Sequence, residues 1–380
     1  MIYENHLLYL RNKINLIDQK LIKTFAKRQS IIKKIAIEKK HTSQPIRDVT
    51  REKLLLKQVT DLGEKLNLNI DFVKNIFKLI IEYSVSTQTK ILEKKNNFSP
   101  SIFSFLGPKG SYSHIAVMNC KKKYKKIKEK TCSSFTEVVE SVENKKSNFA
   151  ILPIENTSSG SINEVYDLLK NTNLFIVGET YIPINHCLLA IPNTNLENIK
   201  KIYSHTQPFQ QCSKFIKKFP DWKIRHTLSS ADAIQHVAKI RKKNIAALGS
   251  EIGGKYHKLQ VLLKNISNQK NNITRFLILG NNPINILEEK PIKTTLLFTF
   301  EKKTKSLLEI LSILEEHNLI MTKLESRPIY DHPWEETFYM DILMKKKSSL
   351  TANILTKLHN ITKSLKILGY YQNISSNINI

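Results

Sequence analysis

Residues 1–95 hold a single proline and a single glycine, and this scarcity of helix breakers constrains the fold more than any other feature of the chain. Apolar residues recur at steps of three and four along the start of this region, at Leu7, Leu10, Ile14, Ile17, Leu21 and Phe25. The stripe continues through Ile32, Ile35 and Ala36, which predicts a first helix of more than about 30 residues. Because two short neighbours cannot bury so long a stripe, we expect a partner subunit to cover part of it.

Two further helices complete this region. The second is expected from Asp48 to Leu66, and the third from Asp71, as its N-cap, to Leu92. The polar segment from Lys94 to Pro100 ends in Ser-Pro and is typical of a linker. Residues 1–95 are therefore predicted to form an all-α domain of three helices in an intertwined dimer.

Short apolar runs alternate with helical segments over residues 101–282, which predicts an α/β domain. Helices are expected at Ser134–Glu143 and Ser230–Ile240. The runs of strand length are Ile102–Phe105, Phe149–Leu152, Leu174–Val177, Leu188–Ile191, Ile245–Leu248 and Phe276–Leu279.

The third region, residues 294–375, is expected to follow the order βαββαβ, an α+β ferredoxin-like pattern. Its elements are expected at Thr295–Phe300, Ser306–His317, Leu324–Arg327, Thr337–Leu343, Leu350–Ile361 and Ile367–Tyr370.

The formal net charge of +27 admits three interpretations. A nucleic-acid partner is one. A biased composition, rich in Lys, Ile and Asn with only 10 glycines, is another. A positive field that attracts a small polyanionic substrate is the third. The densest basic run, Lys121–Lys130, has no aromatic residue except Tyr124, which favours a solvated face over a groove that stacks bases. We therefore expect no nucleic-acid partner.

The remaining composition points to a cytoplasmic protein. The four cysteines, Cys120, Cys132, Cys187 and Cys212, form no CxxC pair and no zinc spacing with histidine, so reduced thiols and no metal site are expected. The segment from Met1 to Arg11 has no long apolar core typical of a signal peptide, and no run is long enough to cross a membrane. No Walker loop or GxGxxG motif suggests a cofactor.

Polar residues in the helical region fall at spacings that place them on shared faces. Arg28 and Lys39 are three turns apart on one side of the first helix, whereas Arg11 lies about 100° around it. Two further pairs, Asp48 with Glu52 and Ser84 with Gln88, are spaced i,i+4. Such charges also occur on helix surfaces with no function other than solvation.

These positions give the segment a specific resemblance. With Asp48-Val-Thr-Arg51-Glu52 and Ser84-Val-Ser-Thr-Gln88, it resembles the all-helical chorismate mutase domain of the P-protein family over its first 90 residues or so. The resemblance implies that Arg28, and Arg11 of the partner subunit, clamp the two chorismate carboxylates. It also implies that Lys39 and Gln88 donate to the ether oxygen in catalysis. Glu52 would hold the substrate hydroxyl, while Asp48, Arg51 and Ser84 orient the rest.

Four stretches in the α/β region are rich in glycine, hydroxyl and amide groups. Each adjoins an expected strand, where the loops of an open sheet gather at a cleft. Any one of them alone would be an ordinary turn. They are Gly107–Ser113, Pro153–Ser161, Ser204–Gln211 and Thr274–Phe276.

These stretches resemble the prephenate dehydratase domain, through its Thr-Arg-Phe signature and its Glu-Asn-Thr-Ser-Ser-Gly loop. The resemblance implies a fold like a two-lobed periplasmic binding protein, with prephenate between the lobes. Thr274 would supply the catalytic hydroxyl, and Arg275 would neutralise substrate charge or order the loop. The implied prephenate-binding residues are Glu155, Asn156, Thr157, Ser158, Ser204, Gln211, Thr274, Arg275 and Phe276.

The third region resembles an ACT domain, a module that binds amino acids, on its βαββαβ order and the motif Glu325-Ser326-Arg327-Pro328. In the P-protein family this motif belongs to the phenylalanine site. The family carries Gly-Ala-Leu-Val where this chain has Lys305-Ser306-Leu307-Leu308. Glycine there lets the polar head of a ligand approach the helix N-terminus. We therefore expect phenylalanine to be a weak effector.

Together the resemblances cover about residues 5–372 and imply a homodimeric, bifunctional enzyme of phenylalanine synthesis. It would rearrange chorismate to prephenate and convert prephenate to phenylpyruvate. The alternative is an amino-acid-responsive regulator with inactive catalytic domains. The intact catalytic motifs and the altered sensor motif speak against that alternative.

Overall fold

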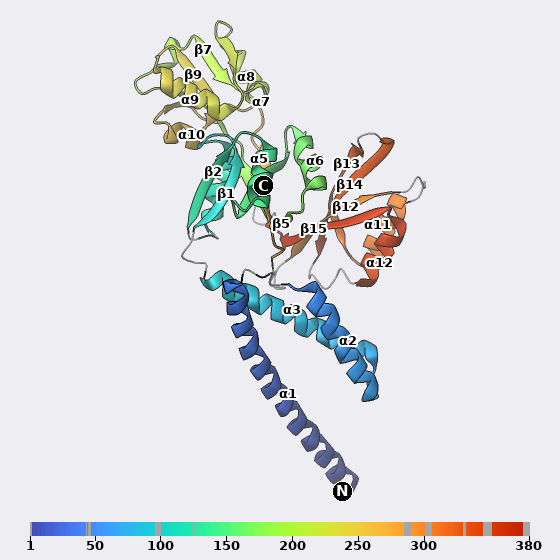
Figure 1. Cartoon of the computed structure of the whole chain (residues 1–380). Helices are drawn as coiled ribbons and strands as arrows, with labels where there is room; N and C mark the ends of the chain where they lie inside the picture. Colours follow the sequence, from blue (N-terminus) through green and yellow to red (C-terminus); the bar gives the residue numbers. More distant parts are fainter. Residues whose placement is uncertain are drawn as a thin grey trace. The chain divides into compact units, whose positions relative to one another are not determined.

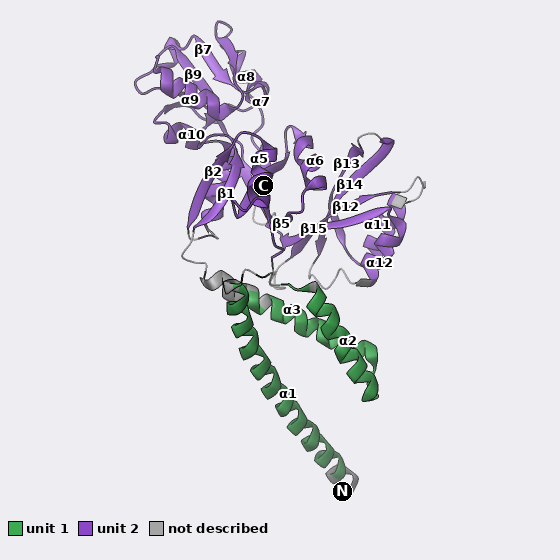
Figure 2. Ribbon diagram, in the orientation of Figure 1, with its two compact units in different colours: residues 1–99 green, residues 100–380 purple. Residues whose placement is uncertain are grey.

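The computed structural model describes residues 2–42, 44, 47–95, 100–122, 124, 126–284, 291–300, 306–329, 332–344 and 352–374. The chain divides into two compact units, residues 1–99 and residues 100–380 (Figures 1 and 2).

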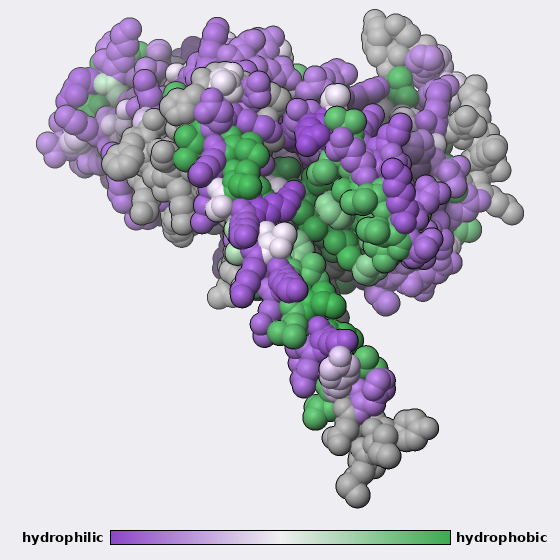
Figure 3. Space-filling model, turned by 60° about the horizontal axis from the view of Figure 1, so that its bottom comes forward, coloured by the Kyte–Doolittle hydropathy of each residue, from purple (hydrophilic) through white to green (hydrophobic). Residues whose placement is uncertain are grey.

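The first unit consists of α1 (Ile2–His41), α2 (Val49–Lys65) and α3 (Ile70–Lys95). The long first helix is confirmed, and its second half packs on α3 through the buried side chains of Ile32 and Ala36. Every residue from 6 to 27 is exposed, the apolar stripe included. In the space-filling view, apolar side chains along α1 are open to solvent (Figure 3).

The starts of α2 and α3 are fixed by side-chain caps. The Asp48 carboxylate accepts a hydrogen bond from the Arg51 backbone N–H, so Asp48 is the N-cap of α2. The expectation that Asp71 caps α3 is wrong. The cap is Asn69, whose Oδ1 accepts from the Phe72 N–H, because the tight turn at Asn67 (φ 53°) starts the helix at Ile70. Asp71 instead lies in the first turn, where its charge suits the helix dipole.

The second unit begins with a mixed sheet in the order β2-β1-β3-β11-β5, which we call lobe A. Strands β1, β2 and β3 run parallel, and β11 runs antiparallel between β3 and β5, with β4 paired to β3. Its strands are β1 (Ser101–Leu106), β2 (Ile127–Cys132), β3 (Phe149–Asn156), β4 (Gly160–Ser161), β5 (Phe175–Pro183) and β11 (Ile273–Gly280), and its helices α4 (Tyr112–Asn119), α5 (Phe135–Glu143) and α6 (Asn163–Asn171).

A second sheet, lobe B, is inserted between β5 and β11, in the order β10-β6-β9-β7-β8. The chain therefore passes between the lobes twice, at residues 184–185 and 264–272. Lobe B comprises β6 (His186–Ala190), β7 (Lys201–Ser204), β8 (Lys223–His226), β9 (Ile245–Ser250) and β10 (Gln260–Leu263), with α7 (Thr206–Gln211), α8 (Ser213–Ile216), α9 (Ser230–Ile240) and α10 (Glu251–Tyr256).

The third sheet is antiparallel, in the order β13-β14-β12-β15, and the expected βαββαβ order is confirmed. Its elements are β12 (Ile292–Thr299), α11 (Ser306–Glu316), β13 (Ile320–Ile329), β14 (His332–Met344), α12 (Ala352–Ile361) and β15 (Ser364–Gln372). One face packs on α11 and α12 through Ile310, Leu314 and Leu358. From the other face, Tyr339 and Tyr371 enter the core of lobe A, so the two sheets share one core.

The expected strands are present with longer bounds, but no expected run of strand length corresponds to β2, β4, β7, β8 or β10. The last three are only four residues each, which is too short for an alternation of apolar and polar residues to be recognised. Strand β2 begins inside the basic run Lys121–Lys130 and lies at the edge of its sheet, where lysines discourage edge-to-edge pairing. Two lysines of the run, at positions 123 and 125, fall outside the described residues.

Glycine at 369 is required where β15 lies against β5, because an added Cβ would overlap the Ile176 carbonyl oxygen. We expect Gly369→Ala to lower the free energy of unfolding of residues 100–380 by about 1–3 kcal/mol, since backbone must shift to make room. Urea denaturation followed by tryptophan fluorescence measures it, because Trp222 and Trp334 both lie in this unit. The matched control is Gly280→Ala on β11, whose Cβ would meet Phe149 at an ordinary 3.4 Å. Equal midpoints for the two variants would contradict the prediction.

Candidate active sites

The amide of Asn156, at the end of β3, organises a polar site in lobe A. Its Nδ2 donates hydrogen bonds to Asn272 Oδ1 at 2.6 Å and to Thr274 Oγ1 at 2.9 Å. Asn156 and Thr274 face each other because they pair across strands β3 and β11. All three side chains are at least nine-tenths buried, so their relative positions are fixed.

The other side of the same amide shapes the loop that follows β3. Asn156 Oδ1 accepts hydrogen bonds from the backbone N–H groups of Ser158 and Ser159, both at 2.9 Å. Thr157 fastens the loop to the strand opposite, since its Oγ1 accepts from the Ile273 N–H and donates to the Asn271 carbonyl. Gly160 closes the turn with φ +79°, a conformation that other residues adopt at a cost.

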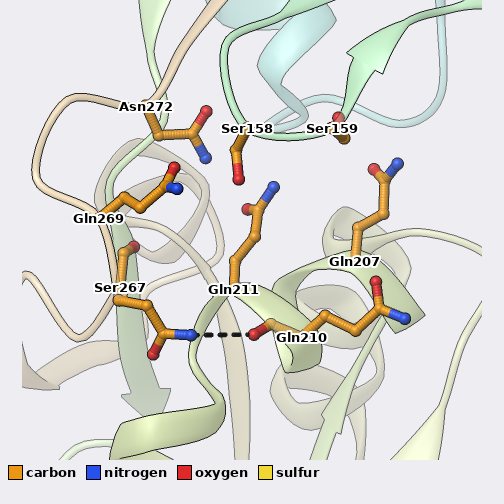
Figure 4. A pocket seen from close by; sticks show the side chains of 9 residues that line it. Ser158, Ser159, Gln207, Gln210, Gln211, Ser267, Gln269 and Asn272 are labelled. Atoms are coloured by element: carbon orange, nitrogen blue, oxygen red, sulfur yellow. Dashed lines mark hydrogen bonds between the residues drawn. The ribbon is translucent and has the colours of Figure 1, made fainter.

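A cavity of about 450 Å³ opens beside this loop, between the two lobes. In Figure 4, Ser158 and Asn272 point toward Gln211 and Gln269 across it. Its size is typical of a small-molecule site. Every lining side chain is a neutral hydroxyl or amide: Ser158, Ser159, Gln207, Gln210, Gln211, Ser267, Asn268, Gln269 and Asn272.

Helix α7 supplies the lobe B side of the cavity, and two neighbours hold it. His205 caps the helix, its Nδ1 accepting from the Gln207 N–H. Asn268, in the second crossing segment, donates from Nδ2 to the Gln210 carbonyl at 3.1 Å (Figure 4). Gln211 Oε1 lies 2.8 Å from His186 Nε2.

Arg275 points away from this cavity. Neighbouring residues of a strand point to opposite faces of a sheet, so Thr274 and Arg275 diverge. The Arg275 guanidinium is buried among Glu155 at 3.0 Å, Glu179 at 2.9 Å and Asp341 at 2.6 Å, and it donates to Tyr371 Oη. Burial alone would lower the pKa of Arg275, but Tyr371 and the carboxylates outweigh it and the pKa is raised.

Charged residues of β13 extend this cluster toward the loop. Lys323 bridges Glu155 at 3.0 Å and Glu325 at 3.2 Å, and Glu325 also accepts from Ser161 Oγ. Arg327 forms a two-pronged contact with Asp167 of α6. Burial raises the pKa of Glu155, whereas the cations Arg275 and Lys323 lower it. The cations outweigh burial, so the pKa of Glu155 is lowered.

In the first unit, three of the expected mutase residues cluster where α1 packs on α3. Arg28 Nη1 donates to Ser84 Oγ, and burial lowers the pKa of Arg28. Gln88 is buried, and its Oε1 accepts no hydrogen bond within the described part of the chain. Lys39 is half-buried on the same helix as Arg28, while Arg51 is exposed on α2.

Two further mutase residues have other surroundings. Glu52 pairs with Arg47 at 3.1 Å, and Arg47 also contacts Glu82. Arg11 is exposed, and the rise of a helix places it about 26 Å along α1 from Arg28. Arg11 and Arg28 of one chain therefore cannot bind the same small molecule.

The structure thus gathers some expected prephenate residues and separates others. Ser158 and Gln211 line the cavity. Asn156, Thr157 and Thr274 do not line it, but hydrogen bonds join them to the loop and strand beside it. Ser204 differs from expectation, because it is fully buried and its hydroxyl donates to the Leu248 carbonyl. Phe276 is likewise in the core.

Sequence reasoning singled out the stretches that contain Ser159, Gln207 and Gln210 without naming these three as binding residues. It missed Arg47, His186, Ser267, Asn268, Gln269 and Asn272. The amide-rich run from Asn265 to Asn272, just before the Thr-Arg-Phe motif, is the signal that would have located four of them. Among the residues that the structure describes, none form a cluster of three His, Cys, Asp or Glu side chains suited to a metal ion. No helix in the same set is both long and apolar enough to cross a membrane.

Family models match part of each unit. A family model described as prephenate dehydratase matches residues 103–284, and one described as chorismate mutase type II matches residues 10–89.

Two curated relatives are named bifunctional chorismate mutase/prephenate dehydratase. The one from Buchnera aphidicola subsp. Schizaphis graminum is 51% identical and covers 97% of each chain. The one from Escherichia coli K12 is 44% identical and covers 98% of this chain and 97% of its own. A solved prephenate dehydratase from Arthrobacter aurescens, in complex with L-Phe, superposes with a TM-score of 0.64 at 24% identity. It covers 72% of this chain and 90% of its own, and shows likeness of fold.

Proposed function

The chain belongs to the bifunctional chorismate mutase/prephenate dehydratase family, and we propose which of its residues carry each reaction. As in its relatives, the helical unit rearranges chorismate to prephenate. Residues 101–282 convert prephenate to phenylpyruvate. The observation that carries the dehydratase assignment is the Asn156 amide held between the loop of residues 157–160 and Thr274.

In the dehydratase reaction, the bond from the ring to its carboxylate breaks and its electron pair enters the ring. The ring hydroxyl then leaves as water after gaining one proton, and the products are phenylpyruvate, carbon dioxide and water. Thr274 is the hydroxyl that meets the leaving group. Because Asn156 Nδ2 donates to Thr274 Oγ1, the threonine hydrogen is free to point at the substrate, and the donated bond polarises the hydroxyl.

The neutral lining of the cavity suits the departure of carbon dioxide. Negative charge moves off the ring carboxylate in the transition state, so a cation held against that carboxylate would stabilise the ground state more. Ser, Asn and Gln side chains instead supply hydrogen bonds without a fixed positive charge. Of the two roles expected for Arg275, its burial beside the third sheet supports ordering of the loop over neutralising the substrate.

Thr274→Ala is expected to lower kcat for phenylpyruvate formation by about 10²- to 10⁴-fold, and Thr274→Ser to retain much more activity, since it keeps a hydroxyl. Absorbance assays with prephenate measure both, and mutase activity of the same sample controls for integrity. Asn156→Asp separates the two roles of Asn156, because a carboxylate still accepts from Ser158 and Ser159 but cannot donate to Thr274. Full activity of Thr274→Ala would sink the assignment.

For the mutase, we infer that Arg28, Lys39, Asp48, Arg51, Glu52, Ser84 and Gln88 of one chain line a site that Arg11 of a second copy completes. The pericyclic rearrangement needs no nucleophile, so the residues hold the reactive conformer and stabilise the breaking ether bond. The exposed stripe on residues 6–27 and the distance along α1 from Arg11 to Arg28 both support an intertwined homodimer. Gln88 Oε1 is buried and accepts no hydrogen bond from the residues that the structure describes, which suits a side chain whose partners come from outside this chain.

Mixing two inactive variants tests this shared site. Arg11→Ala and Arg28→Ala homodimers should each lose mutase activity, since each lacks a clamp in both sites. After joint refolding, half the dimers are mixed and each mixed dimer has one intact site, so about a quarter of wild-type activity should return. Separately refolded and then pooled variants are the control. No recovery on mixing would contradict a site shared between subunits.

The third sheet, as part of residues 294–375, is proposed to be an ACT domain that responds to phenylalanine. Its βαββαβ order supports this, and the dehydratase of similar fold from Arthrobacter aurescens was solved with L-Phe. In this chain Glu325 and Arg327, from the motif Glu325–Pro328, contact Ser161 and Asp167 of lobe A, which gives the motif a physical route to the catalytic loop. Lys305 lies outside the described residues, and Leu308 is exposed at the start of α11.

We expect phenylalanine to inhibit the dehydratase only weakly, because Lys305 and Leu308 replace smaller residues at the start of α11. Initial rates with prephenate, across a phenylalanine titration, measure this, and the variant Lys305→Gly/Leu308→Val should be more sensitive than the wild type. Equal sensitivity of the two proteins would contradict the role of these positions.

A further inference from the structure

His186 is a buried, titratable residue that the proposed mechanism does not yet use. It is the first residue of β6, directly after the first crossing between the lobes, and is only 1% exposed. Its Nε2 lies 2.8 Å from Gln211 Oε1, and its Nδ1 lies 3.2 Å from Tyr112 Oη. Tyr112 is the first residue of α4 in lobe A, so the three side chains connect the two lobes beside the cavity.

Hydrogen-bond chemistry decides where the imidazole carries its proton. Gln211 Oε1 has no hydrogen to give, so His186 Nε2 is the donor in that pair. In a neutral ring Nδ1 is then an acceptor, and the Tyr112 hydroxyl donates to it, sharing its hydrogen with the Asn185 carbonyl at 3.2 Å. Burial lowers the pKa of His186, with the Gln211 contact opposing, so the neutral ring is favoured.

This arrangement fixes the orientation of the Gln211 amide, because His186 holds its oxygen. With Oε1 held by His186, the NH₂ group of Gln211 is left for the cavity, where Figure 4 shows the side chain pointing toward Ser158. An amide without such a contact is free to rotate and present its oxygen, which would repel a carboxylate. The histidine therefore selects which polar group the substrate meets.

We propose that His186 is a positioning residue of the dehydratase, which fixes the Gln211 amide as a hydrogen-bond donor to a prephenate oxygen while Tyr112 fixes the histidine tautomer. This inference rests on the proposed function. His186 would not contact the substrate itself, because it acts through Gln211, which lines the cavity. In metal sites, comparable outer partners orient the groups that do make contact.

Matched variants test the proposal in the full-length protein, with prephenate as the substrate. His186→Gln keeps an amide N–H near the place of Nε2, whereas His186→Asn keeps polar atoms only near Nδ1. We expect His186→Asn and His186→Leu to lose about 10- to 100-fold in kcat/KM, as displaced contact groups do, and His186→Gln to lose less. The loss in kcat/KM of the His186 variants should come from KM and from kcat in the same proportion as the loss expected for Gln211→Ala.

A double-mutant cycle separates positioning from general structural support. Because His186 acts through Gln211, His186→Leu should add almost nothing to the loss caused by Gln211→Ala. Additive losses, or equal activity of His186→Gln and His186→Asn, would overturn the proposal. Mutase activity of each variant reports on the integrity of the separate helical unit, and a thermal melt reports on residues 100–380.

A measurement on the wild-type protein avoids any folding defect of the variants. Nitrogen chemical shifts of ¹⁵N-histidine-labelled protein should show His186, assigned by its loss in His186→Gln, as the neutral Nε2–H tautomer at pH 7. An Nδ1–H tautomer or a doubly protonated ring would overturn the proposal. Failure of the wild type to form phenylpyruvate from prephenate would instead overturn the proposed function itself.

Discussion

The buried guanidinium of Arg275 is the contact on which the architecture of the second unit depends. Strands β3, β5 and β11 bring Glu155, Glu179 and Arg275 together, and the third sheet adds Asp341 and Tyr371. A charge removed from water must be paired and hydrogen-bonded, so each partner is needed for the others to stay buried. Lys293 of β12 completes the pairing of Glu179 at 3.0 Å.

In the proposed function, this cluster connects the third sheet to the dehydratase site through adjacent residues of one strand. Thr274 hydrogen-bonds to Asn156 and Arg275 contacts Asp341 of the third sheet, so one peptide unit separates the proposed catalytic hydroxyl from the charge cluster. The same proximity explains why the Thr-Arg-Phe motif joins three chemically different residues. Its threonine belongs to the site, its arginine to the charge cluster, and its phenylalanine to the core of lobe A.

The net charge of +27 does not concentrate in the dehydratase cavity, whose lining is neutral. Lys323, which contacts the strand before the loop of residues 157–160, is paired with Glu155 and Glu325. In the helical unit the cations Arg28 and Lys39 belong to the proposed chorismate site. The two proposed sites thus differ in the charge that they present to a carboxylate. A rearrangement that keeps both carboxylates tolerates cations against them, whereas a decarboxylation is better served by neutral donors.

The sequence by itself determined the elements and the chemistry of each region. Helical spacing without breakers predicted α1 and its exposed apolar stripe, and strand-length runs predicted most of lobe A and the third sheet. Those signals are local, since residues three or four apart on a helix share a face whatever surrounds them.

Only the tertiary structure decided which groups meet. Alternation along β11 predicts that Thr274 and Arg275 diverge, but only the packing of the third sheet decides that Arg275 is buried against Asp341 and Tyr371. Ser204 and His186 show the same limit. Ser204 belongs to a stretch that was expected at the cleft, but its buried hydroxyl donates to the Leu248 carbonyl. His186 begins an apolar strand, and the fold places it behind Gln211. Asn272 and Asn156 are 116 residues apart in the chain and 2.6 Å apart in the site, a distance set by strand pairing that no local pattern encodes.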